Sequence, residues 1–165
     1  MQLQLKEKLR RISFQSKGVK NKFKSLLIIC SEDESYDVKL FLKLAKQFSI
    51  TSKKVTLVVL SKKELVEKQQ TLFGTYFISR KSVGFFGRLP VSSKELFQKK
   101  YDLQINYFNK SSVFNDLISA SCQSKIRVGF SKSNKQINDL ILDIDPKQHK
   151  LFLKEINVYL NAILN

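Results

Sequence analysis

The sequence predicts an α/β fold: a Rossmann-like three-layer domain with a mostly parallel sheet, preceded by a basic N-terminal helical arm. Two short, continuous apolar runs, residues 25–30 and 54–60, are typical of strands buried on both faces of a parallel sheet. Between them, residues 38–48 place apolar side chains on one face of a helix. A strand, a helix and a second strand form a right-handed crossover by default, so these two strands are expected to be parallel.

The same alternation continues to the end of the chain. Further strands are predicted at residues 75–78, 101–108, 126–130 and 139–144. Further helices are predicted at residues 62–69 and 113–118, and a short one is predicted to begin at Ser92 or Ser93. Pro146 is expected at the start of the last helix. Ser31, Asp33 or Ser35 is expected to cap the first helix of the body, because short polar side chains accept hydrogen bonds from the free N–H groups of a first turn.

The composition indicates one packed domain. Of the 165 residues, 42% are apolar and 13 are Phe, which is enough for a core without disulfides or metal ions. Cys30 and Cys122 are distant in sequence and belong to no Cys-x-x-Cys pair, which favours a reducing, cytoplasmic location. No secretory leader and no run of about 18 apolar residues is visible, so no transmembrane segment is expected. We expect one domain over residues 25–165 and an arm over residues 1–24.

Positive charge is concentrated in the arm. The chain carries 30 Lys and Arg against 14 Asp and Glu, a formal net charge of +16, and eight of these cations but only one acid fall in residues 1–24. Leu5, Leu9 and Ile12 recur at the spacing of one helical face, and Gly18 is expected to end that helix. Three interpretations remain open: a solvated helix packed on the domain, an arm that neutralises nucleic-acid phosphates, or an amphipathic helix on an anionic membrane surface.

Residues for a familiar catalytic chemistry are not grouped in the sequence. The turn after the first strand, residues 30–35, has no glycine and carries three acids, so neither a dinucleotide fingerprint nor a Walker loop is present. The single His149 is expected on the surface, and Cys30 and Cys122 are expected to pack in the core. No catalytic residue, cofactor or metal site is therefore predicted, and a non-enzymatic protein is favoured over an enzyme.

The loop at residues 84–88, Gly-Phe-Phe-Gly-Arg, is the most individual local feature of the chain. Two aromatic side chains beside an arginine are suited to stacking on unpaired bases. Alternatively, Phe85 or Phe86 anchors the loop onto the sheet, and the glycines only turn the chain. The sequence favours the anchoring interpretation, because Phe is abundant throughout the chain and no second aromatic platform accompanies the pair.

Two segments carry a resemblance to known families. Residues 101–106 (Tyr-Asp-Leu-Gln-Ile-Asn) and 124–131 (Ser-Lys-Ile-Arg-Val-Gly-Phe-Ser), with the basic N-terminal helix and the overall length, resemble an uncharacterised Bacteroidota family of short basic Rossmann-like α/β proteins. The same segments are similar to the N-terminal half of heptosyltransferase-type glycosyltransferases. That resemblance implies the fold, with the chain retained as a binding scaffold, because the turn after Cys30 lacks the glycine-containing loop and catalytic acid of those enzymes.

We expect a non-enzymatic RNA-binding protein of the cytoplasm, associated with ribosomal RNA or a ribosomal subunit, with ribosomal proteins as further partners. The expected phosphate contacts are the cations of the arm and a weaker second patch in the body: Lys6, Lys8, Arg10, Arg11, Lys17, Lys20, Lys22 and Lys24, then Arg80, Lys81 and Arg88. One alternative is a degenerate or partner-dependent glycosyltransferase-like protein. Another is a peripheral membrane protein that binds anionic lipid.

Overall fold

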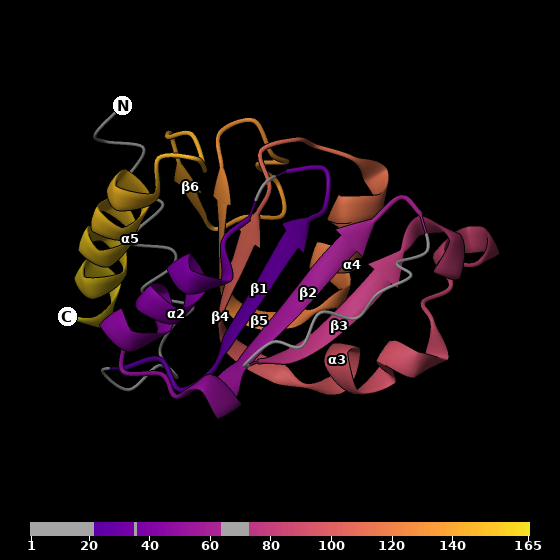
Figure 1. Cartoon of the computed structure of the whole chain (residues 1–165), viewed down its shortest axis with the longest axis horizontal. Helices are drawn as coiled ribbons and strands as arrows, with labels where there is room; N and C mark the ends of the chain where they lie inside the picture. The colour runs from indigo at the N-terminus through magenta and orange to yellow at the C-terminus, as the bar shows by residue number, and fades with distance from the viewer. Residues whose placement is uncertain (1–21, 35, 64–72) are drawn as a thin grey trace.

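The sheet consists of six strands that all run parallel. The computed structural model describes residues 22–34, 36–63 and 73–165. The strands are β1 (Leu26–Ser31), β2 (Val55–Ser61), β3 (Gly74–Ser79), β4 (Lys100–Tyr107), β5 (Gln123–Phe130) and β6 (Leu140–Leu142). Their order across the sheet is β3-β2-β1-β4-β5-β6, and every neighbouring pair is parallel (Figure 1). The predicted α/β fold with a parallel sheet is confirmed.

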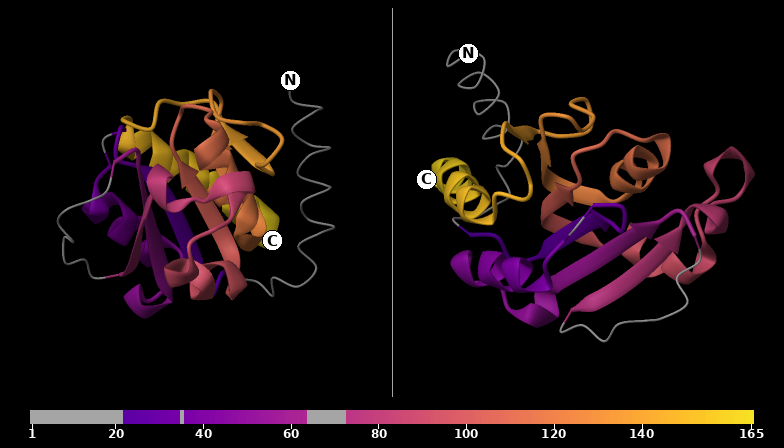
Figure 2. Two further views of the ribbon diagram at one scale, coloured as in Figure 1. Left: turned by 90° about the vertical axis from the view of Figure 1, so that its right-hand side faces the viewer. Right: turned by 45° about the horizontal axis from the view of Figure 1, so that its top comes forward.

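Helices cover both faces of this sheet, which gives the three layers expected (Figure 2). The helices longer than one turn are α2 (Val38–Gln47), α3 (Lys94–Gln98), α4 (Val113–Ser121) and α5 (His149–Leu164). Phe41 of α2 and Phe152 of α5 belong to the larger hydrophobic core, whereas Leu96 of α3 and Ile118 of α4 belong to a second core. Successive side chains of β1 alternate between the two cores, so the cores lie on opposite faces of the sheet.

The strand order reverses between β1 and β4. From β1 the chain moves outward through β2 and β3 on one side, and from β4 it moves outward through β5 and β6 on the other. This is the order of the doubly wound Rossmann fold, in which ligands bind outside the carboxyl ends of the strands at the reversal. The turns after β1 and β4 are therefore the first places in this molecule to look for a site.

The capping residue of α2 differs from the prediction. Its cap is Asp37, whose carboxylate accepts a hydrogen bond from the backbone N–H of Lys39 (2.9 Å). The expectation that Ser31, Asp33 or Ser35 caps this helix is therefore wrong. The helix itself begins at Val38, as its apolar spacing predicts, and the residues directly after β1 form a turn ahead of it.

The start of α5 is later than the sequence suggests. The helix begins at His149, so Pro146 lies ahead of it instead of in its first turn. Pro146 has another role there, because its carbonyl accepts a hydrogen bond from the hydroxyl of Tyr107 at the end of β4. The ring of Tyr107 packs edge-to-face on Phe130 and Phe152, with ring centroids 5.5 and 5.3 Å away. The segment before α5 is thus fixed to the carboxyl end of the sheet.

Two predicted helices fall largely outside the described residues. Of the helix expected at residues 62–69, only the first two residues are described, and of the arm only residues 22–24. The hydrophobic core nevertheless reaches into residues assigned to the arm. Phe23 is 2% exposed, and its ring lies edge-to-face against Phe48, with the centroids 5.8 Å apart.

Asp102 of β4 fastens this first segment to the sheet. Its carboxylate accepts a hydrogen bond from the backbone N–H of Lys24 (2.7 Å) and forms an ion pair with Nζ of Lys125 (2.8 Å). Burial raises the pKa of the Asp102 carboxyl, but the hydrogen bonds from Lys125 and Lys24 outweigh it and hold the pKa below its ordinary value. The ionised carboxylate is therefore favoured by the folded state.

The Asp102→Asn substitution is expected to destabilise the protein by about 1 kcal/mol at neutral pH, because the ion pair is lost. Because the pKa of Asp102 is lower in the folded state than in the unfolded state, its ionised carboxylate stabilises the protein at pH values above the unfolded pKa near 3.8. This stabilisation disappears as the pH falls through the folded-state pKa. Urea unfolding at about pH 7 and about pH 2.5 measures both limits. Asp143→Asn, at an exposed carboxylate, is the control. If Asp102→Asn lowered the free energy of unfolding by the same amount at about pH 2.5 as at about pH 7, this role of the carboxylate would be contradicted.

A chain of buried polar side chains connects β4 with α4 and with the segment before β6. Nε2 of Gln104 donates to Oδ1 of Asn106 (2.9 Å) and to Oγ of Ser119 (2.9 Å). Nδ2 of Asn106 donates to Oδ1 of Asn138 (2.7 Å). Asn138 lies directly over Gly129 of β5, where a Cβ would be only 2.4 Å from Nδ2 of Asn138. The glycine of β5 is therefore required by this close approach.

Candidate functional site

Two 3₁₀ turns follow β3, η2 (Arg80–Ser82) and η3 (Phe85–Gly87). The second turn lies in a small closed loop, residues 84–88. The backbone N–H of Gly84 donates to the carbonyl of Arg88 (2.8 Å) and closes the loop at its base. At the tip, Phe86 has a φ of 60° and the glycine after it a φ of 73°, in the left-handed region that Phe rarely adopts. The fold therefore holds an aromatic residue in an unfavourable backbone conformation at this tip.

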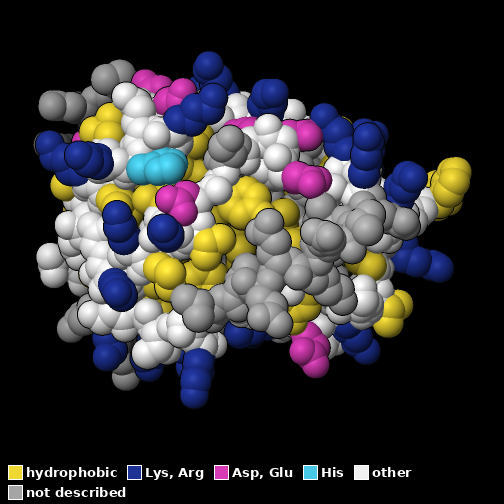
Figure 3. Space-filling model, viewed as in Figure 1, with side chains coloured by type: hydrophobic (Ala, Val, Ile, Leu, Met, Phe, Trp, Pro, Cys, Tyr) yellow, Lys and Arg dark blue, Asp and Glu magenta, His cyan; other side chains and the backbone are white. Residues whose placement is uncertain are grey.

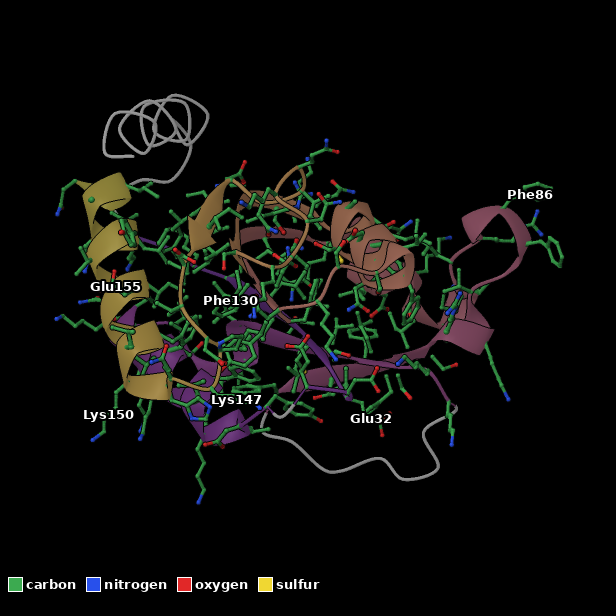
Figure 4. All side chains as sticks on the ribbon, turned by 90° about the horizontal axis from the view of Figure 1, so that it is seen from above. Glu32, Phe86, Phe130, Lys147, Lys150 and Glu155 are labelled. Atoms are coloured by element: carbon green, nitrogen blue, oxygen red, sulfur yellow. The ribbon has the colours of Figure 1, made fainter. Side chains whose placement is uncertain are left out.

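Both aromatic rings of the loop are exposed. The exposed fractions are 92% for Phe85 and 103% for Phe86, and the ring centroids lie 6.1 Å apart. The loop projects from the body (Figure 2), and Phe86 lies at the end of the molecule opposite Glu155 of α5 (Figure 4). The prediction that Phe85 or Phe86 anchors the loop onto the sheet is wrong. Adjacent exposed apolar side chains of this size are a feature of interaction surfaces.

Three cations accompany these rings. Arg80 and Lys81 lie in η2 and Arg88 closes the loop, and all three are exposed. None of them forms an ion pair with a carboxylate of the described chain. Figure 3 shows Lys and Arg side chains beside the hydrophobic side chains that project from this end of the molecule. The second patch predicted from the sequence is thus carried by one segment, residues 80–88, which also holds the two exposed aromatic rings.

The other predicted contacts lie elsewhere or outside the described residues. Lys6, Lys8, Arg10, Arg11, Lys17 and Lys20 belong to the part that the structure does not describe. Lys22 and Lys24 are exposed just before β1, at the amino edge of the parallel sheet, whereas Arg80 follows the carboxyl end of β3. Strands of this length span about 20 Å. The structure therefore does not bring Lys22 and Lys24 next to the loop.

A cavity of about 330 Å³ opens at the carboxyl ends of the strands. Its wall includes Ser31 at the end of β1, Arg80 after β3, Lys110 after β4, and Asn115 in the first turn of α4. It therefore lies at the reversal of strand order, where open α/β sheets bind ligands. Sequence reasoning missed Lys110 and Asn115. The polar run Asn-Lys-Ser-Ser after the predicted strand 101–108 was the available signal.

The acids after β1 are already engaged within the protein. Asp33 forms an ion pair with Nζ of Lys62 (2.7 Å). Both carboxylate oxygens of Glu34 accept hydrogen bonds from the backbone N–H of Asn109 (2.9 and 2.8 Å). Two of the three acids in this turn thus hold neighbouring segments in place, and their negative charge is partly compensated.

The two cysteines are unsuited to nucleophilic chemistry at neutral pH. Both are buried and free, and burial raises the pKa of the Cys122 thiol to about 12 and also raises the pKa of Cys30.

Among the residues that the structure describes, no three His, Cys, Asp or Glu side chains are grouped to hold a metal ion. No helix within the described ranges is long and apolar enough to cross a membrane.

The fold and the loop define a Rossmann-like α/β protein with an exposed aromatic and basic loop at the carboxyl edge of its sheet. The chain belongs to the family of unknown function DUF6913, whose model matches residues 1–163. The resemblance to an uncharacterised family is thereby confirmed at that level. No curated protein and no solved structure matches the chain.

Proposed function

We propose that the protein binds single-stranded segments of RNA through the loop at residues 84–88 and the cations around it, with ribosomal RNA as the partner. The observation that carries the proposal is the nearly complete exposure of Phe85 and Phe86 near cations that form no ion pair with a carboxylate of the described residues. Each base that stacks on an aromatic ring contributes about 1–3 kcal/mol, and such stacking tolerates any base. Ribosomal RNA offers unpaired loops and bulges with splayed bases.

The charge of the chain favours the same class of partner. A formal net charge of +16 attracts an extended polyanion at long range and raises the association rate. Lys22 and Lys24 would contact phosphates away from the loop, because they lie at the amino end of the parallel strands, whereas Arg80 follows the carboxyl end of β3. The arm then supplies affinity without sequence preference, and the loop supplies the contact with unpaired bases.

Salt dependence tests this proposal directly. Affinity for an unstructured RNA oligonucleotide is expected to fall steeply between about 50 and 200 mM salt, measured by fluorescence anisotropy. Replacing Arg80, Lys81 and Arg88 together by Gln is expected to reduce the slope of log affinity against log salt by about 2, since each phosphate contact to a single strand contributes about 0.7.

The matched control removes three lysines from another surface. Lys39, Lys43 and Lys46 are exposed along α2, and their replacement by Gln changes the net charge by the same amount. The control is expected to retain most of the wild-type slope. Equal slopes for the two triple variants would show that the loop has no special place in binding. Deletion of residues 1–21, which leaves the buried Phe23 in place, measures the contribution of the arm.

Anionic lipid is the competing partner for the same loop. Membrane-surface proteins usually insert the apolar face of an amphipathic helix, whereas this loop offers two rings on a single turn. Co-sedimentation with vesicles of phosphatidylserine and phosphatidylcholine separates the two partners. Binding to these vesicles that excess RNA does not displace, in the absence of measurable RNA affinity, would overturn the RNA assignment.

The finer family resemblances remain predictions. They are the likeness to a Bacteroidota family and the likeness to the N-terminal half of heptosyltransferase-type glycosyltransferases. A degenerate or partner-dependent glycosyltransferase-like protein would be stabilised against heat by a nucleotide sugar. An unchanged melting temperature in millimolar nucleotide sugar would count against that alternative.

A further inference from the structure

Two largely buried residues line the strand-end cavity with polar side chains that form no hydrogen bond to the described part of the chain. Ser31 and Asn115 are each 7% exposed, and both line the cavity. Within the described part of the chain, neither the hydroxyl of Ser31 nor the carboxamide of Asn115 forms a hydrogen bond. The buried side-chain atoms without a partner in the described part of the chain are Oδ1 of Asp116 and Nε of Arg127, so the polar atoms of Ser31 and Asn115 are open to the cavity. A ligand in the cavity can therefore form hydrogen bonds with both side chains.

The first turn of α4 adds backbone donors to the same cavity. Ser112 caps this nine-residue helix, and its Oγ accepts from the N–H of Asn115 (3.1 Å). Its carbonyl accepts from the N–H of Asp116 (2.9 Å). The N–H groups of Val113 and Phe114 have no acceptor among the described residues, and both residues line the cavity. Free N–H groups at the positive end of a helix dipole favour an anion.

The charged side chains around the cavity leave a positive balance. Arg80 and Lys110 line it and form no ion pair with a carboxylate of the described chain. The nearby carboxylate of Asp33 is paired with Lys62, and that of Glu34 is occupied by the N–H of Asn109. An anion in the cavity would therefore meet two cations that have no carboxylate partner among residues 22–34, 36–63 and 73–165, whereas both carboxylates in its wall already have partners.

We infer that this cavity binds a phosphate monoester, with its phosphate at the N-terminal turn of α4. The phosphate oxygens accept hydrogen bonds from the free N–H groups, from Asn115 and Ser31, and from Arg80. The organic group packs on the side chain of Val113, which lies in the cavity wall and is 87% exposed. The volume of about 330 Å³ lies in the range of small-ligand sites, about 300–1,000 Å³. This inference goes beyond the proposed RNA binding and does not depend on it.

Calorimetric titration of the full chain with uridine monophosphate and with inorganic phosphate tests the site. Asn115→Leu, which removes the carboxamide at similar volume, is expected to weaken binding of the monophosphate about tenfold or more. Arg80→Gln is expected to do the same. Lys81→Gln is the matched control, because Lys81 is the neighbour of Arg80 in η2 and does not line the cavity. It is expected to change the affinity less than about twofold.

A second measurement separates ligand binding from a structural role of Asn115. Because the carboxamide of Asn115 forms no hydrogen bond to the described part of the chain, replacing it by a side chain of similar size is expected not to lower the melting temperature of the ligand-free protein. The same variant should lose the stabilisation that the monophosphate gives to the wild type. A lower melting temperature for Asn115→Leu, with unchanged ligand stabilisation, would assign Asn115 a structural role and overturn the site.

The source of the phosphate is resolved by comparing three probes: free uridine monophosphate, inorganic phosphate and an RNA oligonucleotide with a 5′-phosphate. Binding of any of them that is weakened by Asn115→Leu supports the site and identifies its source. Equal affinities for wild type and Asn115→Leu, or no binding of any probe at millimolar concentration, would refute it. The RNA proposal is tested with a 5′-hydroxyl oligonucleotide, whose binding should depend on Phe85 and Phe86 but not on Asn115, so either proposal can fail alone.

Discussion

Replacing both Phe85 and Phe86 by Ser is expected to weaken binding of a 5′-hydroxyl, unstructured RNA by about thirtyfold or more, because two stacked bases at about 1 kcal/mol each already account for that factor. The rings are 92% and 103% exposed, so their removal takes little from the core. Fluorescence anisotropy at constant salt measures the affinity, and urea unfolding shows whether stability is retained.

The control for this double variant is Val91→Ser, because Val91 is 86% exposed and lies outside the closed loop. It should bind RNA like the wild type. Replacement of both phenylalanines by Tyr should preserve most of the affinity, since a phenol ring also stacks on bases. If the Ser variant bound RNA as tightly as the wild type, the exposed rings would have another purpose and the proposed function would be wrong.

Gly129→Ala is expected to destabilise the protein by about 2–4 kcal/mol, because the new methyl group overlaps a side chain that has no room to move. Its Cβ would lie 2.4 Å from Nδ2 and 2.5 Å from Cγ of Asn138. Asn138 is held by the carboxamide of Asn106 (2.7 Å) and by the carbonyl of Asn134, to which it donates (2.9 Å). Urea unfolding measures the loss of stability.

Gly74→Ala is the matched control for this substitution. Gly74 also lies in a strand of the sheet, and a Cβ built there meets nothing within 4 Å. Its replacement is expected to be neutral or slightly stabilising. Equal stabilities for Gly74→Ala and Gly129→Ala would show that the polar chain around Asn138 yields easily, contrary to its hydrogen bonding.

The sheet could be predicted from the sequence because its central strands are apolar on both faces. Every residue of β1 and β2 is buried, so both appear as continuous apolar runs. The strand predicted at residues 126–130 begins three residues after the start of β5, because Gln123–Lys125 are polar and partly exposed and extend the strand through pairing with β4. Pairing with a neighbour of distant sequence leaves no pattern in the segment itself.

The candidate sites were less accessible to sequence reasoning. The abundance of Phe suggested that Phe85 or Phe86 is buried, but a hydrogen bond from Gly84 to Arg88 closes the loop and keeps both rings away from the sheet. The cavity depends on β1 and β4 being neighbours, which is a property of strand order. Asn115 therefore looked like an ordinary residue of an amphipathic helix.

Because Phe86 adopts a left-handed backbone conformation, selection for folding and selection for binding are expected to enrich different residues at this position. A library selected for folding alone should enrich Gly or Asn there, because these residues adopt a φ of 60° at lower cost than Phe. A library selected for a bound partner should enrich aromatic residues instead. The tip of the loop is thus a position at which the demands of folding and of recognition favour different amino acids, and Phe satisfies the second at the expense of the first.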